Sequence, residues 1–297
     1  MPATISSLEM VQRLIEFDTT SSKSNLSLIE FIADYLDGYG VSCVLVESDD
    51  GSKANLIASV GPDVEGGVVL SGHTDVVPVA GQDWSRDPFR VVEDSDRLYA
   101  RGSADMKSFI ALALALVPEF VSRRLVRPIH FALSYDEEIG CLGAPRLISR
   151  LMEVVPSPQA VIVGEPTEMK VVGAHRGASL FTTRIAGRPG HSSQPGRGVN
   201  AIEHAAACIG FLGGVAKDFR DSADADETRF DPPHATLSVG VIEGGTATNI
   251  IAEHCHFSWG CRAANPQTTE DTLTKLNAYA NGELLPVMKT IAPEASV

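Results

Sequence analysis

The first part of the chain alternates short apolar runs with helical patterns, and this alternation constrains the fold more than any other feature of the sequence. The apolar runs are VSCVLVE, ANLIASV, GVVLSG, IHFALSY and AVIVG. Among them lie a helix with a capping-box start at Ser6, a helix that ends at Gly38, a long apolar helix at 108–121 and a helix around 145–155. Strands that alternate with helices predict an α/β layer structure with a largely parallel, buried sheet.

The rhythm changes after about residue 178. A strand, a Gly/Pro-rich loop, a helix, two strands and a further helix follow, at 180–187, 188–198, 200–214, 235–243, 254–262 and from about 268. The order βαββα is that of a ferredoxin-like unit without its final strand, because the sequence ends at APEASV, where that strand would begin. We therefore predict a catalytic-type domain at 1–177 and a smaller domain at 178–297. The acidic segment 217–233 is interpreted as a solvated connection.

Charge and composition exclude several classes of partner. The formal net charge of −14 would repel nucleic acid and an anionic membrane, whereas it suits a protein that gathers metal cations. The N-terminal residues lack the pattern of a secretory signal, and no uncharged stretch reaches membrane-spanning length. The five cysteines form no Cys-x-x-Cys pair, so we expect reduced, structural thiols in a cytoplasmic protein.

Four short segments place metal-binding residue types directly after apolar runs or in a turn before a helix. His73 and Asp75 follow the run GVVLSG, and the Asp75 carboxylate is placed to accept the second ring N–H of His73. Asp105 precedes the long apolar helix, the pair Glu137 and Glu138 follows IHFALSY, and Glu165 follows AVIVG. In a parallel α/β sheet the carboxyl ends of the strands form the binding crevice, so we expect these side chains to converge.

Taken singly, each segment has an ordinary structural interpretation: an Asp before a helix is usually an N-cap, and an acidic pair at a strand end is usually solvated. Together, one histidine and several carboxylates form the nitrogen and oxygen ligand set that zinc or cobalt prefers. Two adjacent glutamates then divide the work. One can bind metal while the other takes a proton from the attacking water, whose pKa a metal lowers towards about 7.

The segments SGHTDVVPV, ARGSADMK, SYDEEIGCLG, GEPTEMKVV, GHSS and GGTATNII resemble the acetylornithine deacetylase branch of the aminoacylase and succinyl-diaminopimelate desuccinylase family. This resemblance covers essentially the whole chain and implies a zinc-peptidase-like catalytic domain with two zinc ions per subunit, or cobalt in their place. It implies that Asp105 bridges the ions, that His73 and Glu165 complete one site, and that Glu138 serves the other. It also makes Glu137 the general base and Asp75 the residue behind His73.

For the second domain, the resemblance implies a lid that carries the contact of a homodimer. His191 would reach the partner's site to stabilise the oxyanion, while Asn249 and Arg262 would hold the carboxylate of a small N-acyl amino acid. A guanidinium binds a carboxylate bidentately, which suits this role for Arg262. The implied reaction is hydrolysis of N2-acetylornithine to ornithine and acetate, in arginine biosynthesis. Another N-acyl amino acid, or a dipeptide, is the alternative substrate.

The resemblance also implies a segment beyond the lid that returns to the catalytic domain and supplies a last histidine to the second metal. The 297 residues contain no such segment, so we expect one tightly bound zinc and weak or no turnover, and a non-catalytic metal-binding or dimerising protein stays an alternative. His254 and His256 share one face of an expected strand and mimic a metal pair, but they are interpreted as exposed sheet residues. Four further histidines, His130, His175, His204 and His234, have no ligand-like neighbours.

Overall fold

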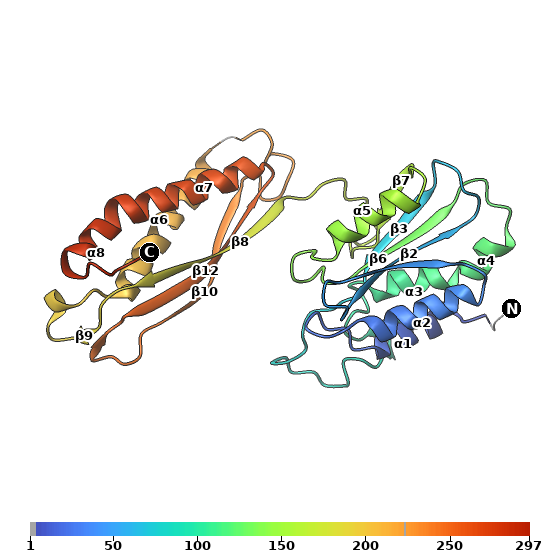
Figure 1. The fold of residues 1–297 in the computed structure, drawn as a ribbon, viewed down its shortest axis with the longest axis horizontal. Coiled ribbons are helices and arrows are strands. Elements are labelled where there is room, and N and C mark those ends of the chain that lie inside the picture. The colour runs from blue at the N-terminus through green and yellow to red at the C-terminus, as the bar shows by residue number, and fades with distance from the viewer. Residues whose placement is uncertain (1–3, 223) are drawn as a thin grey trace. The chain divides into compact units, whose positions relative to one another are not determined.

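A computed structural model describes residues 4–222 and 224–297. The chain forms two compact units that divide between Lys170 and Val171. Figure 1 shows one sheet with its helices in each unit. The expected boundary lay a few residues further on, at 177/178.

The first unit is built on a five-stranded sheet in the order β1-β2-β6-β3-β7. The strands are β1 Cys43–Glu47, β2 Ala54–Val60, β3 Val68–His73, β6 Ile129–Ser134 and β7 Ala160–Val163. β2 is antiparallel to both of its neighbours, whereas β6, β3 and β7 pair in parallel, so four of the five strands point the same way. The expectation of a mostly parallel α/β sheet is confirmed.

Helices cover both faces of this sheet (Figure 1). They are α1 Ser7–Glu16, α2 Leu26–Asp37, α3 Lys107–Ala115, α4 Val117–Ser122 and α5 Ala144–Val154. The main core joins α1, α2 and α3 to alternate residues of β2 and β6, such as Leu56 and Phe131. A smaller core lies on the other face, under α5, around Ile57 and Leu147. The edge strand β7 is exposed along its whole length.

Local sequence signals explain the helix ends. The Ser6 hydroxyl accepts the Glu9 amide at 3.2 Å, so the expected N-cap is confirmed. The single helix expected at 108–121 is wrong: it divides at Leu116 into α3 and α4, with Pro118 in the first turn of α4, where its missing N–H matters least. A small hairpin of β4 Val92–Asp94 and β5 Arg97–Tyr99 was not expected.

The second unit has a three-stranded antiparallel sheet in the order β10-β12-β8, with helices over one face (Figure 1). Its elements are β8 Gly177–Ala186, β9 Gly190–His191, the 3₁₀ turn Pro195–Arg197, α6 Ala201–Asp221, β10 Thr236–Gly244, β11 Ile250–Ile251, β12 His254–Ala263, α7 Pro266–Tyr279, the π-helical turn Ala280–Leu284 and α8 Leu285–Ile291. Alternate residues of β12, such as Phe257 and Trp259, pack against α6 and α7, and the opposite face is open. Ser296 pairs with Ala186 on the free side of β8, where the fourth strand of a ferredoxin-like sheet belongs.

The acidic segment 217–233 differs from the expectation. Its first residues continue α6 to Asp221 because they keep the amphipathic pattern of that helix. Glu227 is buried rather than solvated, and its carboxylate pairs with Arg176 Nε at 2.5 Å. In the described part of the chain, none of the helices combines the length and apolar character that a membrane crossing requires.

Candidate metal centre

The expected ligands gather at one edge of the first unit's sheet. His73 is the last residue of β3, the Glu137–Glu138 pair follows β6, and Glu165 follows β7. Since these three strands are parallel neighbours, their carboxyl ends lie together. Asp105 reaches the same place from the turn before α3, where the peptide bond between Asp105 and Met106 is cis.

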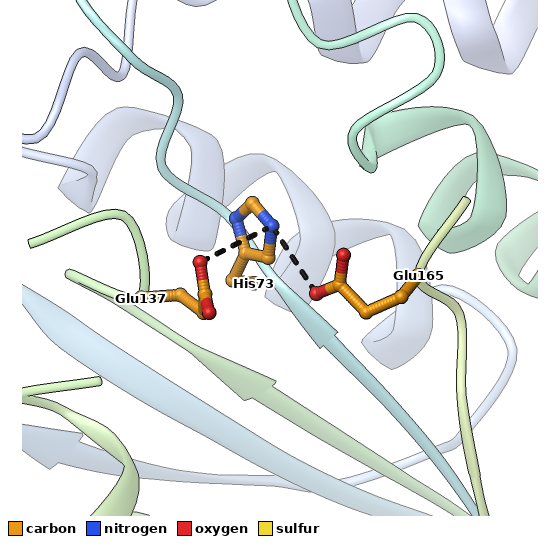
Figure 2. Close-up of side chains that lie close together, drawn as sticks. All are labelled: His73, Glu137 and Glu165. Carbon is orange, nitrogen blue, oxygen red and sulfur yellow. Dashed lines mark ion pairs between the residues drawn. The ribbon is translucent and has the colours of Figure 1, made fainter. Parts of the chain in front are cut away.

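The His73 ring is at the centre of this cluster. Its Nε2 atom lies 2.8 Å from Asp105 Oδ1, 3.6 Å from Glu165 Oε1 and 3.9 Å from Glu137 Oε2. The carboxylates of Glu137 and Glu165 flank the ring (Figure 2). The described residues contain two groups whose ligand atoms all lie within 4.8 Å of one another: His73, Glu137 and Glu165, and His73, Asp105 and Glu138.

One spacing in the cluster fits a small transition-metal ion, whereas the 2.8 Å between His73 Nε2 and Asp105 Oδ1 is a hydrogen-bond distance. For bonds of about 2.0–2.2 Å and tetrahedral angles, two ligand atoms on one zinc ion are about 3.4 Å apart. The 3.6 Å between His73 Nε2 and Glu165 Oε1 is close to that separation. The His73 side chain is 1% exposed while Asp105 and Glu165 are 47% and 40% exposed, so the imidazole is buried and the carboxylates reach solvent. Both groups contain His73, which makes this imidazole the shared ligand.

One hydrogen bond fixes the tautomer of His73, but it is not the one expected. Nδ1 donates to the Asp75 backbone carbonyl at 2.9 Å, whereas the Asp75 carboxylate oxygen Oδ1 is 3.6 Å away. As expected, Nε2 faces the carboxylates: it lies 2.8 Å from Asp105 Oδ1 and can bind a metal once it has lost its proton.

The Asp75 carboxylate is instead the anchor of the glutamate pair. Oδ1 accepts the amide of Glu137 at 3.0 Å, and Oδ2 accepts the amide of Glu138 at 3.2 Å and the Ser21 hydroxyl at 2.7 Å. Asp75 is buried, so these contacts are shielded from water. Asp75 therefore connects the loop after β3 to the loop after β6, which holds the two glutamates.

Protonation in the site follows from burial and crowded charge. Burial lowers the pKa of His73, but contacts with Asp75 and Asp105 outweigh it and raise the pKa to about 9. Burial and the charge of Asp105 raise the pKa of Glu138. Burial also raises the pKa of Glu165, although His73 opposes this. Such a cluster of carboxylates that resist ionisation is relieved by a bound cation.

In the second unit the expected residues form two separate sets. His191 pairs through its backbone with Ile250, and Asn249 O accepts the amide of Ser192, so His191 and Asn249 are neighbours across the small β9–β11 pair. Arg262 lies near the other end of β12, eight residues beyond His254, a distance of about 26 Å along a strand. The second unit of one chain therefore does not bring Arg262 to Asn249.

None of the remaining histidines belongs to a ligand group found among the described residues. His254 and His256 share the open face of β12, as expected, and their side chains are 75% and 43% exposed. His130 is buried beside Ser59, whereas His175 is exposed and His204 and His234 are partly exposed.

Four residues around the site were not identified from the sequence. Asp136 directly precedes the glutamate pair, and Lys53 pairs with it from the residue before β2. Ser21 contacts Asp75, and Lys107 is fully buried with Nζ on the Phe17 carbonyl at 2.7 Å. Lys107 and Asp136 lie within the segments ARGSADMK and SYDEEIG, and this position beside the ligand residues was an available signal for a role in the site. Ser21 and Lys53 gave none, because their partners lie 54 and 83 residues away.

The chain is similar in sequence and in fold to several known proteins. The model of peptidase family M20/M25/M40 matches residues 69–291. An acetylornithine deacetylase of Pasteurella multocida is 34% identical over 289 residues, which are 95% of this chain and 73% of the relative. An M20 metallo-carboxypeptidase from Sulfolobus solfataricus shares the fold with a TM-score of 0.73 at 17% identity, over 92% of this chain and 76% of its own. A dinuclear metal-binding M20 peptidase of Bacillus subtilis has a TM-score of 0.59 at 15% identity, over 93% and 68%.

Proposed function

The chain belongs to peptidase family M20/M25/M40, a family of metal-dependent hydrolases, and on that basis we propose that it hydrolyses N2-acetylornithine to ornithine and acetate. The observation that carries the proposal is the convergence of His73, Asp105, Glu138 and Glu165 beside a second glutamate, Glu137. Identity to an acetylornithine deacetylase over most of the chain supports the choice of substrate. The product ornithine connects the reaction to arginine biosynthesis.

The reaction needs a metal, a base and a group that stabilises negative charge. A zinc or cobalt ion held by these ligands would polarise the acyl carbonyl and make the attacking water more acidic. Glu137 would take a proton from that water and deliver it to the leaving amine as the amide C–N bond breaks. Asp75, through the two glutamate amides, keeps the base and the ligand Glu138 in register. His191 would donate to the developing oxyanion.

The substrate carboxylate is assigned to Arg262 and Asn249. Because one lid holds these two residues near opposite ends of β12, a second copy of the chain has to contribute one of them to a common site. This supports a homodimer in which the partner's lid supplies the His191–Asn249 pair. Sedimentation at micromolar concentration tests it, and a strict monomer would contradict it.

We further propose that the chain binds about one zinc ion tightly. Both ligand groups use His73, whose Nδ1 is occupied by the Asp75 carbonyl, so its single free nitrogen serves one ion at a time. A second ion would have only carboxylate ligands among the described groups. Metal analysis after dialysis checks the count, and two tightly held zinc ions per chain would mean that another residue completes the second site.

The decisive experiment compares two isosteric variants. Glu137→Gln should retain zinc and lose turnover by about 10²–10⁴-fold, because only the base is removed. Glu138→Gln should weaken metal binding first. The opposite pattern would reverse the two roles. Parallel assays with acetylornithine, succinyl-diaminopimelate and simple dipeptides test the substrate, and a zinc-loaded chain that turns over none of them would favour a non-catalytic protein.

The proposal includes a cytoplasmic location. All five cysteines are free thiols, and three of them are buried, which suits a reducing compartment. Fractionation of expressing cells tests this directly.

A further inference from the structure

The turn after β6 determines where the two glutamates point. Asp136 adopts a φ of +55°, a left-handed conformation that few residues other than Gly, Asn and Asp take up. This turn directs the next two amides at Asp75, with Glu137 N 3.0 Å from Oδ1 and Glu138 N 3.2 Å from Oδ2. The backbone of both glutamates is thus set by the conformation of Asp136.

Lys53 reaches this turn from the residue before β2. Its Nζ atom lies 2.5 Å from Asp136 Oδ1 and 2.5 Å from the Ser21 carbonyl oxygen. The Lys53 and Asp136 side chains are only 14% and 9% exposed, so the ion pair is largely shielded from solvent. One ammonium group therefore joins the N-terminal segment at Ser21 to the glutamate turn.

Both segments that Lys53 joins also hold Asp75. The Ser21 hydroxyl donates to Asp75 Oδ2, and the residues after Asp136 donate their amides to the same carboxylate. Without Lys53, the glutamate turn would lose its tie to the Ser21 segment, and the Asp136 carboxylate would lose its ion-pair partner among the described residues. The turn would then be free to move away from Asp75, and the following amides and the glutamate side chains would move with it.

We propose that Lys53 is a positioning residue of the metal centre: by bridging Asp136 and the Ser21 carbonyl, it holds the glutamate turn against Asp75 and so keeps the site ready for its ion. The inference rests on the proposed function, since it takes the site to be metal-binding. Lys53 acts through Asp136 and Asp75 and is assigned no contact with substrate.

The test is a titration of the metal-free full-length chain with Co²⁺, followed by the visible absorption of the bound ion. Lys53→Met keeps an unbranched side chain and removes the charge, and we expect it to weaken Co²⁺ binding by about 10-fold or more. Arg176→Met is the matched control, because it removes the cation of another largely buried ion pair, with Glu227 in the second unit. It should lower the unfolding midpoint without changing the affinity for Co²⁺.

A double variant separates positioning from simple charge compensation. In Lys53→Met with Asp136→Asn, the asparagine tolerates the left-handed turn and leaves no unpaired charge. The unfolding midpoint should recover while Co²⁺ binding stays weak, because the tie to Ser21 is not rebuilt. Wild-type affinity in the double variant would overturn the inference, and the double variant carries the test if Lys53→Met does not fold.

The two proposals fail in different ways. If the wild-type chain binds Co²⁺ and Lys53→Met binds it equally well, the positioning role is wrong and the proposed function stands. If the wild-type chain shows no Co²⁺ spectrum, the metal centre itself is wrong and the role of Lys53 falls with it.

Discussion

Replacing Asp75 with asparagine tests the anchor of the glutamate pair, because the change alters no volume. The carboxylate accepts three donors: the Glu137 amide on Oδ1, and the Glu138 amide and the Ser21 hydroxyl on Oδ2. An asparagine NH₂ group at Oδ1 would face the Glu137 amide. At Oδ2 it would face the Glu138 amide, although the Ser21 hydroxyl can rotate to accept from it. In either orientation two donors point at each other.

The magnitude follows from this count. A buried donor left without an acceptor costs about 1–3 kcal/mol, so two of them cost about 2–6 kcal/mol. Asp75 is 2% exposed, which leaves little room for water to substitute. With a urea m-value of about 2 kcal/mol/M, a loss of 3 kcal/mol lowers the midpoint of the first unit by about 1.5 M.

The assay is urea unfolding of Asp75→Asn at pH 7 in the presence of a chelator, so that no bound metal contributes. Asp18→Asn is the control, because Asp18 also accepts an amide and a hydroxyl, both from Thr20, but is 31% exposed. It should lose less than about 1 kcal/mol. If Asp75→Asn unfolds within about 0.5 kcal/mol of the wild type, the carboxylate does not hold both amides and the account of the site fails.

Three further results are expected. In the metal-free protein, the wild type should lose its stability advantage over His73→Asn as the pH rises from 6.5 to about 9. Burial lowers the pKa of His73, but its carboxylate neighbours raise it more, to about 9. The folded state therefore holds this proton more tightly than the unfolded state, and the stabilisation is lost as the proton leaves. The measurement is the unfolding free energy of both chains against pH. Burial lowers the pKa of Lys107 to about 7, so Lys107 changes the stability in the opposite direction, but it does so in both chains and cancels in the difference. A difference in unfolding free energy that stays constant with pH would contradict the raised pKa of His73. Gly187→Ala should destabilise the second unit by about 1–3 kcal/mol, since the new Cβ would lie 2.0 Å from a backbone oxygen. Gly213→Ala, in the middle of α6 where nothing lies within 4 Å of the new Cβ, should stabilise it by about 0.5–1 kcal/mol. Calorimetry that ranks the two variants the other way would refute this. Zinc at 100 times its Kd should stabilise the wild type by about 2.7 kcal/mol, seen as a higher Tm, and an equal gain in Asp105→Asn would place the ion elsewhere.

The sequence predicted those parts of the fold that depend on local pattern. Apolar runs of strand length between helical patterns predicted the sheet, and the parallel pairing of β3, β6 and β7 then brings His73, Glu137 and Glu165 together. The break at Leu116 was also available, because Pro118 interrupts the helical run. The ligand residues could be found because the chemistry of metal binding restricts residue types at strand ends.

Contacts between distant segments could not be predicted in this way. Lys53 looks like a charged residue at the start of a strand, and only the folded chain brings it to Asp136. The same limit applies to Glu227. Its place in an acidic segment predicts a solvated side chain, but in the folded chain it is buried and paired with Arg176. The choice between the backbone carbonyl and the carboxylate of Asp75 as the partner of His73 depends on the path of the backbone after β3.

The exposed edge strand β7 has a consequence for handling the protein. All four of its residues are exposed, Val161 and Val163 by 54% and 56%, and within the described residues no strand pairs with its outer N–H and C=O groups. Such an edge accepts a strand from another molecule, so concentrated preparations should form β-rich oligomers that seed one another and grow with time. Val161→Lys places a charge on this edge and should slow that growth, as light scattering would record. A lysine on the already polar surface of α7, in the second unit, should have no such effect.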